Sequence, residues 1–199
     1  MIDVHGLPAW CGLRPAPLAA ARVAVAGIPY DGSATYRRSA SHAPARMRRL
    51  SAVMPPIDER GRCFGDLTLH DLGDLELGDS VAAGWQAAAQ RMAELPPGAF
   101  LTVFGGDHCS AIPVLAAQAR RHPDLAVLWV DALDPAFAPG TEIPCAGGLS
   151  TRQALDLVAA VARASRPVGL DVCEVAPVGA DEITVLAALK LVFETWALL

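Results

Sequence analysis

The sequence predicts an α/β fold with a mostly parallel sheet, because short apolar runs typical of buried strands alternate with longer segments of helical periodicity. Several of the apolar runs end abruptly in loops rich in Asp, Gly and Pro, which cannot continue a strand. Loops of this kind follow the strands of parallel sheets at the edge where ligands bind. At 199 residues, the chain is long enough for one domain with a substantial core.

The expected organisation is a lead-in followed by a single domain. Residues 1–20 are rich in Pro, Gly and Ala and are predicted to form a poorly ordered N-terminal lead-in. Residues 21–199 are predicted to form one α/β domain without an internal repeat or a low-complexity linker.

Apolar runs mark the expected strands, and Ala-rich or amphipathic segments mark the expected helices. The strands are predicted at Arg22–Gly27, within Thr68–Gly78, and at Ala99–Phe104, Leu125–Val130 and Pro167–Val172. The helices are predicted at Ser41–Met54, Ser80–Leu95, Ala111–Arg121, Ser150–Ser165 and Thr184–Leu199. The side chains of Ser41, Ser80 and Thr184 are the expected helix caps.

The segment Leu125–Gly148 is the most informative part of the chain. Its apolar run ends in Asp131, Asp134 follows three residues later, and the prolines beyond require an irregular loop. A carboxylate at the end of a buried strand is a candidate ligand or base. The alternative is that both aspartates form turns with their own side chains.

A second candidate loop, GGDHCS at Gly105–Ser110, contains His108 directly before an expected helix. Imidazole is a common metal ligand and acid–base group, although an isolated histidine is more often structural. The Asp71–Asp74 pair lies in a D-x-G-D pattern that is common in turns, and the turn interpretation is favoured there.

Composition excludes several classes of protein. The chain is 53% hydrophobic and 19% charged, with a net charge of −5 and no basic stripe, so nucleic acid is not an expected partner. No apolar stretch is long enough to cross a membrane, and the N-terminus lacks the pattern of a secretory signal. The five cysteines are widely spaced without C-x-x-C, which predicts reduced thiols in a cytoplasmic protein.

Five loop motifs, in chain order, resemble the ureohydrolase family of arginases, agmatinases and formimidoylglutamases, with the first most similar to agmatinases. They are GIPYDGSATYR at Gly27–Arg37, the D-x-G-D element at Asp71–Asp74, GGDHCS at Gly105–Ser110, DALDPAFAPGTEIPCAGGL at Asp131–Leu149, and GLDVCEVAP at Gly169–Pro177. The fourth resembles the family pattern D-x-D-x-L-D-P-x-x-A-P-G-T-G-T-P-x-x-G-G-L.

This resemblance implies a three-layer α/β/α sandwich in which two Mn²⁺ ions activate a water that attacks a guanidinium carbon and releases urea. It implies that His108 and Asp131 are metal ligands. Asp134 matches the aspartate of the L-D-P element, which does not bind the metal directly in the family, and is predicted only as a weak ligand recruited to an incomplete site. It also implies that Glu174 contacts the guanidinium of a small guanidino substrate, so that Asp131 and Glu174 are the candidate catalytic residues. The family is commonly trimeric or hexameric, which predicts a homo-oligomer.

The sequence departs from the family pattern in its metal ligands. The family has a D-A-H-x-D cluster and a later D-x-D cluster, but here a single segment matches the start of one and the end of the other. Leu133 then stands at a histidine position, and Trp129 stands at the first aspartate of D-x-D. These matches predict an internal deletion between the two clusters, with Asp131 at the junction.

Two ligands cannot hold a binuclear site, so the predicted manganese content is one ion, completed by Asp107 or Asp134, or none. Three functions remain open: a ureohydrolase with an incomplete metal site, an inactive homologue that acts as a binding or oligomer subunit, and a truncated product without function. Loss of central strands would also expose apolar surface. With a mean hydropathy of +0.34, this predicts oligomerisation or aggregation.

Overall fold

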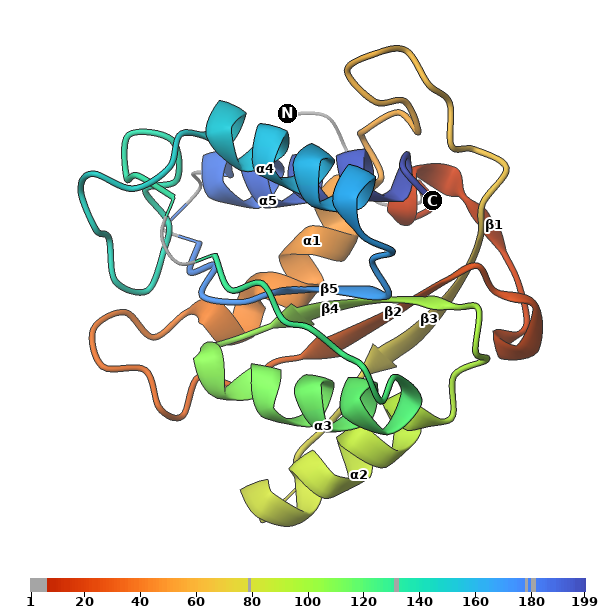
Figure 1. Ribbon diagram of the computed structural model, residues 1–199. Coiled ribbons are helices and arrows are strands. Elements are labelled where there is room, and N and C mark those ends of the chain that lie inside the picture. Colours follow the sequence, from red (N-terminus) through yellow and green to blue (C-terminus); the bar gives the residue numbers. More distant parts are fainter. Residues whose placement is uncertain (1–6, 79, 131–132, 178, 180–181) are drawn as a thin grey trace.

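The computed structural model describes residues 7–199 except residues 79, 131–132, 178 and 180–181. Figure 1 shows a sheet with helices on both faces, which confirms the predicted three-layer α/β/α arrangement. None of the helices in this described part of the chain is long and apolar enough to cross a membrane.

The sheet has five strands in the order β1-β3-β2-β4-β5, and every pairing between them is parallel. The strands are β1 (Arg14–Pro15), β2 (Val23–Ile28), β3 (Thr68–Asp74), β4 (Phe100–Gly105) and β5 (Gly169–Val172). Every residue of β2 and β4 is buried, as expected for strands covered on both faces, and the mostly parallel sheet is confirmed.

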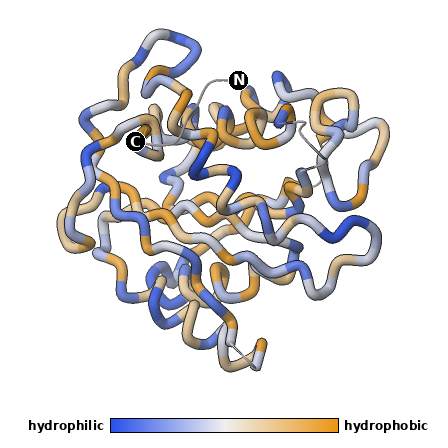
Figure 2. The backbone as a smooth tube through the Cα atoms, turned by 180° about the vertical axis from the view of Figure 1, so that it is seen from behind, coloured by the Kyte–Doolittle hydropathy of each residue, from blue (hydrophilic) through white to orange (hydrophobic). Residues whose placement is uncertain are grey.

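The helices divide between the two faces of the sheet. They are α1 (Ala43–Ser51), α2 (Val81–Ala93), α3 (Ala111–Arg121), α4 (Thr151–Ala164) and α5 (Ile183–Trp196). In Figure 1, α1, α4 and α5 lie on one face and α2 and α3 on the other. The two faces therefore enclose separate hydrophobic clusters, and Figure 2 shows hydrophobic residues gathered along the central strands.

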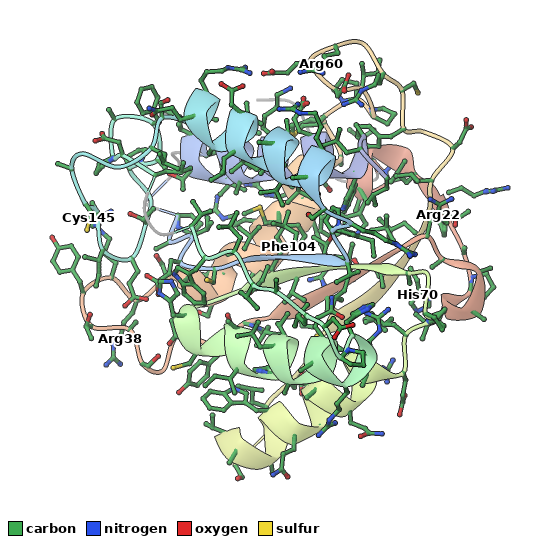
Figure 3. All side chains as sticks on the ribbon, viewed as in Figure 1. Arg22, Arg38, Arg60, His70, Phe104 and Cys145 are labelled. Carbon is green, nitrogen blue, oxygen red and sulfur yellow. The ribbon has the colours of Figure 1, made fainter. Side chains whose placement is uncertain are left out.

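The larger cluster lies beneath α1 and α5 and contains most of the buried aromatic side chains. Phe104 of β4, labelled in Figure 3, stacks on Trp10 with ring centroids 5.2 Å apart. Trp196 of α5 contacts the edge of Trp10 and donates a 2.9 Å hydrogen bond from Nε1 to Thr102 Oγ1. These contacts attach the C-terminal helix to the centre of the sheet.

The predicted lead-in is wrong for its described part, because residues from Leu7 onward belong to the domain. Trp10 is only 3% exposed, and its Nε1 donates a 2.8 Å hydrogen bond to Asp71 Oδ2. The strand β1 pairs with β3 at the edge of the sheet. Pro, Gly and Ala dominate this segment, and the few large apolar side chains that anchor it gave a weak sequence signal.

Of the three expected helix caps, only Ser80 is confirmed, since its hydroxyl accepts a hydrogen bond from the Ala83 N–H of α2. Ser41 instead donates a 2.8 Å hydrogen bond to Asp31 Oδ2. Thr184 lies inside the first turn of α5 and accepts a 2.7 Å hydrogen bond from the Gly140 N–H. Both hydroxyls hold neighbouring loops, which a local helix signal cannot anticipate.

The predicted strand Leu125–Val130 is also wrong. The segment forms no ladder among the described residues, and Val127, Leu128, Trp129 and Val130 are each between 48% and 59% exposed. Both edges of β4 are already paired, with β2 and β5. The chain must also travel from α3 on one face to α4 on the other, and Figure 1 shows it doing so as an extended coil. The apolar run was correctly identified, but it pairs neither with β4 nor with the outer edge of β5, and it remains coil.

Candidate functional site

Three loops meet at the carboxyl ends of β2, β4 and β5, where the sequence predicted the site. The Asp107 N–H donates a 2.7 Å hydrogen bond to the carbonyl of Tyr30, and the Glu174 N–H donates a 2.6 Å bond to the carbonyl of Gly106. A Cβ on Gly106 would lie 1.8 Å from that Tyr30 oxygen, so only glycine permits this approach. The loop that carries His108 is thereby held between the other two.

His108 and Glu174 form the centre of this site. Glu174 Oε1 accepts a 3.0 Å hydrogen bond from the His108 backbone N–H and lies 2.8 Å from Nδ1 of the same residue. Glu174 has a φ of +64°, an unfavourable backbone conformation for a residue with a side chain. The structure therefore brings two of the predicted site residues into direct contact.

Trp129 covers the other side of His108. The indole and imidazole are stacked, with centroids 5.0 Å apart and an interplanar angle of 20°. The His108 side chain remains 41% exposed and that of Glu174 19% exposed, so the pair can be reached from solvent. Trp129 is the residue that stands at the first aspartate of the family's D-x-D pattern.

Asp107 is a structural part of its loop. Its Oδ2 accepts hydrogen bonds from the Ser33 N–H at 2.8 Å and the Ser33 hydroxyl at 2.6 Å. Its Oδ1 accepts a 2.9 Å bond from the Cys109 N–H, and the residue is 2% exposed. Both oxygens are thus engaged in holding the loops after β2 and β4 together.

Asp134 holds its own loop in the same way. Its Oδ1 accepts a 2.9 Å hydrogen bond from the Ala136 N–H, and its Oδ2 accepts a 2.6 Å bond from the Gly147 N–H. These backbone donors lower the pKa of the Asp134 carboxyl. The geometry agrees with the turn-forming alternative, and metal binding by Asp134 stays a prediction. Asp131, the other aspartate predicted here, lies outside the described residues.

Glu142 belongs to this site and was not among the sequence candidates. It is 3% exposed, its Oε1 accepts a 2.8 Å hydrogen bond from the Thr35 N–H, and its own N–H donates a 3.1 Å bond to the Glu174 carbonyl. Its Oε2 is buried and receives no hydrogen bond from an N–H or hydroxyl donor in the described part of the chain, and its carboxyl group interacts with that of Glu174. The available signal was local: APGTEIP has Glu142 where the family pattern APGTGTP has glycine.

Burial dominates the electrostatics of the carboxyl groups around His108. Burial raises the pKa of Glu174, His108 opposes this shift, and the adjacent Glu142 carboxyl adds to it. Burial also raises the pKa of Asp171, on β5, to about 7, opposed by His108 and the Val172 N–H. The site is therefore rich in carboxyl groups whose charged forms are poorly compensated.

The described residues do not fit a binuclear manganese centre. Nowhere among them do three His, Cys, Asp or Glu side chains come together in an arrangement that could hold a metal ion. The His108 Nδ1 is paired with Glu174, and an indole covers the ring. Asp131 could add one carboxylate, whereas two Mn²⁺ ions need several ligands each.

Comparisons with known proteins identify relatives of the whole chain. A model described as "Arginase family" matches residues 21–133 and 130–197. The agmatinase of Serratia proteamaculans is 26% identical over 262 residues, an alignment that covers 85% of each chain. The agmatinase of Shigella sonnei is 26% identical over 266 residues with the same coverage.

Solved structures show the same fold. The proclavaminate amidino hydrolase of Streptomyces clavuligerus superposes with a TM-score of 0.85 at 24% identity, covering 96% of each chain. The agmatine ureohydrolase of Thermoplasma volcanium gives a TM-score of 0.77 at 18% identity, covering 92% of this chain and 91% of its own. A formiminoglutamase of Trypanosoma cruzi, solved with Mn²⁺, gives 0.81 at 16% identity and covers 89% of this chain and 92% of its own.

Proposed function

The chain belongs to the arginase family, and we propose that it binds a small guanidino compound at Glu174 without hydrolysing it through a binuclear manganese centre. The contact between Trp129 and His108 is the observation that carries this proposal. An indole offers no ligand to a metal ion, and this one packs against the histidine that the family pattern assigns to manganese. The chain therefore retains the family's candidate guanidinium acceptor but not its ligand set.

Glu174 is suited to receive a guanidinium. Its side chain is partly exposed, and a carboxylate can accept two parallel N–H bonds from the planar cation. In the described part of the chain its one ion-pair partner is His108, and neither arginine nor lysine contacts it. Among the described residues, a cationic ligand would thus compete for Glu174 with a protonated His108 but with no arginine or lysine.

We also propose that a segment present in the relatives is missing from the interior of this chain. The two stretches matched by the family model share residues 130–133, which is where the sequence placed the junction of the two ligand clusters. The 262-residue alignment with the Serratia agmatinase is longer than the 199-residue chain, so part of that relative has no counterpart here. Such a loss accounts for both the missing ligands and the coil at Leu125–Val130.

Three measurements test the proposal. After dialysis from excess Mn²⁺, elemental analysis should find well under one ion per chain, and incubation with agmatine should release no urea. Calorimetry should nevertheless detect agmatine binding that Glu174→Gln abolishes. Asp156→Asn, an exposed carboxylate on α4, is the matched control and should bind as the unaltered chain does. Two ions per chain with urea release, or no agmatine binding at all, would refute the proposal.

A second candidate function is hydrolysis of the same guanidino class with a single metal ion. The exposure of the His108 side chain favours it, since an exposed imidazole remains available to bind a metal ion. This candidate predicts close to one Mn²⁺ per chain and urea release that chelation stops. Urea release without bound metal would contradict both candidates.

A further inference from the structure

We propose that Glu142 is a second carboxylate of the Glu174 site and makes it selective for a cationic guanidinium over a neutral urea. This inference rests on the proposed binding function and adds the charge class of the ligand. Because the family pattern has glycine at this position, the second carboxylate is a feature of this chain.

The backbone places the two glutamates side by side. The Glu142 N–H donates to the Glu174 carbonyl at 3.1 Å, and the Ala176 N–H donates to the Gly140 carbonyl at 2.7 Å. These bonds join the loop after β5 to the loop that contains Glu142. The Thr35 N–H fixes Glu142 Oε1 from the loop after β2. Glu142 is therefore held from two directions, through its backbone N–H and its Oε1, and neither of these hydrogen bonds involves Oε2.

That second oxygen is the unusual feature. Glu142 Oε2 is buried and receives no hydrogen bond from an N–H or hydroxyl donor among the described residues, although buried carboxylates are normally paired because their desolvation is costly. Its carboxyl group interacts instead with the Glu174 carboxyl; burial is the main cause of the raised pKa of Glu174, and this contact adds to it. An arrangement that is unfavourable in the free protein is stabilised when a cation binds beside it.

Among the described residues, no arginine or lysine forms an ion pair with Glu142 and compensates its charge. Arg37 lies close in the fold, but its Nη1 donates to the carbonyls of Pro139 at 2.6 Å and Thr141 at 3.2 Å. Among the described residues, the carboxylate that pairs with His108 is that of Glu174, not that of Glu142. The Glu142–Glu174 carboxyl pair thus has no arginine or lysine partner in the described part of the chain, and a cationic ligand can compensate its charge.

A guanidinium matches this arrangement better than a urea does. Its planar group presents N–H donors on every edge, so it can donate to Glu174 while its charge is attracted by Glu142 behind. A urea has a carbonyl oxygen in place of one charged NH₂ group, and that oxygen would face negative charge. Selectivity of this kind arises from repulsion of the wrong ligand as much as attraction of the right one.

The experiment compares agmatine with its urea analogue, in which oxygen replaces the charged NH₂ group. Calorimetry on the unaltered chain should show at least tenfold tighter binding of agmatine. Glu142→Gln keeps the shape and removes the charge, so the ratio of the two affinities should fall at least tenfold. The melting temperature should hold steady or rise, because a buried unpaired charge has been removed. Asp156→Asn should leave the ratio unchanged.

Any of the following results would refute the inference about Glu142, and each result has a different meaning. An unaltered chain that binds both ligands equally refutes it without any variant, which covers the case of a Glu142→Gln protein that does not fold. An unchanged ratio in Glu142→Gln refutes it while the proposed function stands, provided that Glu174→Gln abolishes binding. A parallel loss of both affinities and of melting temperature would assign Glu142 a purely structural role. Absence of agmatine binding in the unaltered chain refutes both proposals together.

Discussion

The indole of Trp129 lies against the imidazole of His108, with centroids 5.0 Å apart and planes within 20° of parallel. In the family pattern this tryptophan occupies a carboxylate position. Under the predicted ligand assignment, an indole stands at a carboxylate position and packs on the histidine that is predicted to bind manganese.

Trp129→Asp tests the consequence for metal binding. The new carboxylate would restore a ligand type that Mn²⁺ prefers and would uncover His108. We expect Mn²⁺ affinity to rise by about tenfold or more, or ~1.4 kcal/mol, measured by electron paramagnetic resonance of free Mn²⁺. Trp129→Phe keeps an aromatic ring on His108 and should show no gain. Equal affinities of the two variants would disprove the link between Trp129 and the lost metal site.

Removal of Trp10 should destabilise the whole domain. Its ring is buried against Phe104 and Trp196, and truncation of a buried aromatic side chain typically costs about 3–5 kcal/mol. Denaturant unfolding of Trp10→Ala should show a loss of this size. Leu7→Ala, at an exposed position three residues earlier, should change the free energy of unfolding by less than about 0.5 kcal/mol. Similar stability of both variants would mean that the N-terminal segment does not contribute to the core in solution.

Asp71 gives the domain a defined dependence on pH. Burial raises its pKa, but hydrogen bonds from Arg48 and Trp10 outweigh that effect, so the pKa lies below its usual value. Because the pKa is lower in the folded state, its stabilisation is present above the unfolded value of about 3.9 and is lost as the pH falls through the folded value. Asp71→Asn should therefore cost on the order of 2 kcal/mol at pH 7 and much less near pH 2. A cost that does not change with pH would contradict this, and Asp66→Asn, at an exposed position, serves as the control.

The exposed segment Val127–Val130 should promote self-association, as the sequence predicted for a domain that has lost covering structure. These four consecutive apolar residues are each about half exposed, and soluble monomers usually avoid large exposed apolar surface. Sedimentation velocity should show a concentration-dependent shift to larger species that Leu128→Lys reduces. Ile112→Lys removes an exposed apolar residue of α3 outside this segment and should have less effect. A monomer at all concentrations would argue against the predicted homo-oligomer.

The sequence predicted correctly those strands and helices whose conformation depends mainly on neighbouring residues in the chain. The strands β2 and β4 were predicted because short, largely apolar runs bounded by Gly and Pro are typical of buried parallel strands. The partly buried β5 was predicted from a similar run although it contains Asp171. The helix α3 was predicted to the residue for a similar reason. The Leu125–Val130 run has the same local pattern, yet its conformation depends on which strands occupy the neighbouring places in the sheet.

In the candidate site, too, the residues in local motifs were predicted, and those that depend on distant contacts were missed. His108 and Glu174 were identified because their motifs are local, and the structure brings them together. Glu142 was missed because a single glutamate in a Pro- and Gly-rich loop resembles any exposed loop residue. Its importance depends on burial and on Thr35, which is 107 positions away in sequence. A pattern match alone also could not reveal that the Trp129 side chain would stack on His108.

The coil between α3 and α4 has a further consequence for how the chain responds to cleavage. An exposed stretch without ladder hydrogen bonds is the preferred substrate of a protease, so limited digestion should cut first near Val127–Val130. The two fragments would still be joined by the β4–β5 pairing and by Trp196, which reaches Thr102 from the far side of the cut. The nicked protein should therefore remain folded under native conditions, and the two halves, produced separately, should reassemble as a complementing pair.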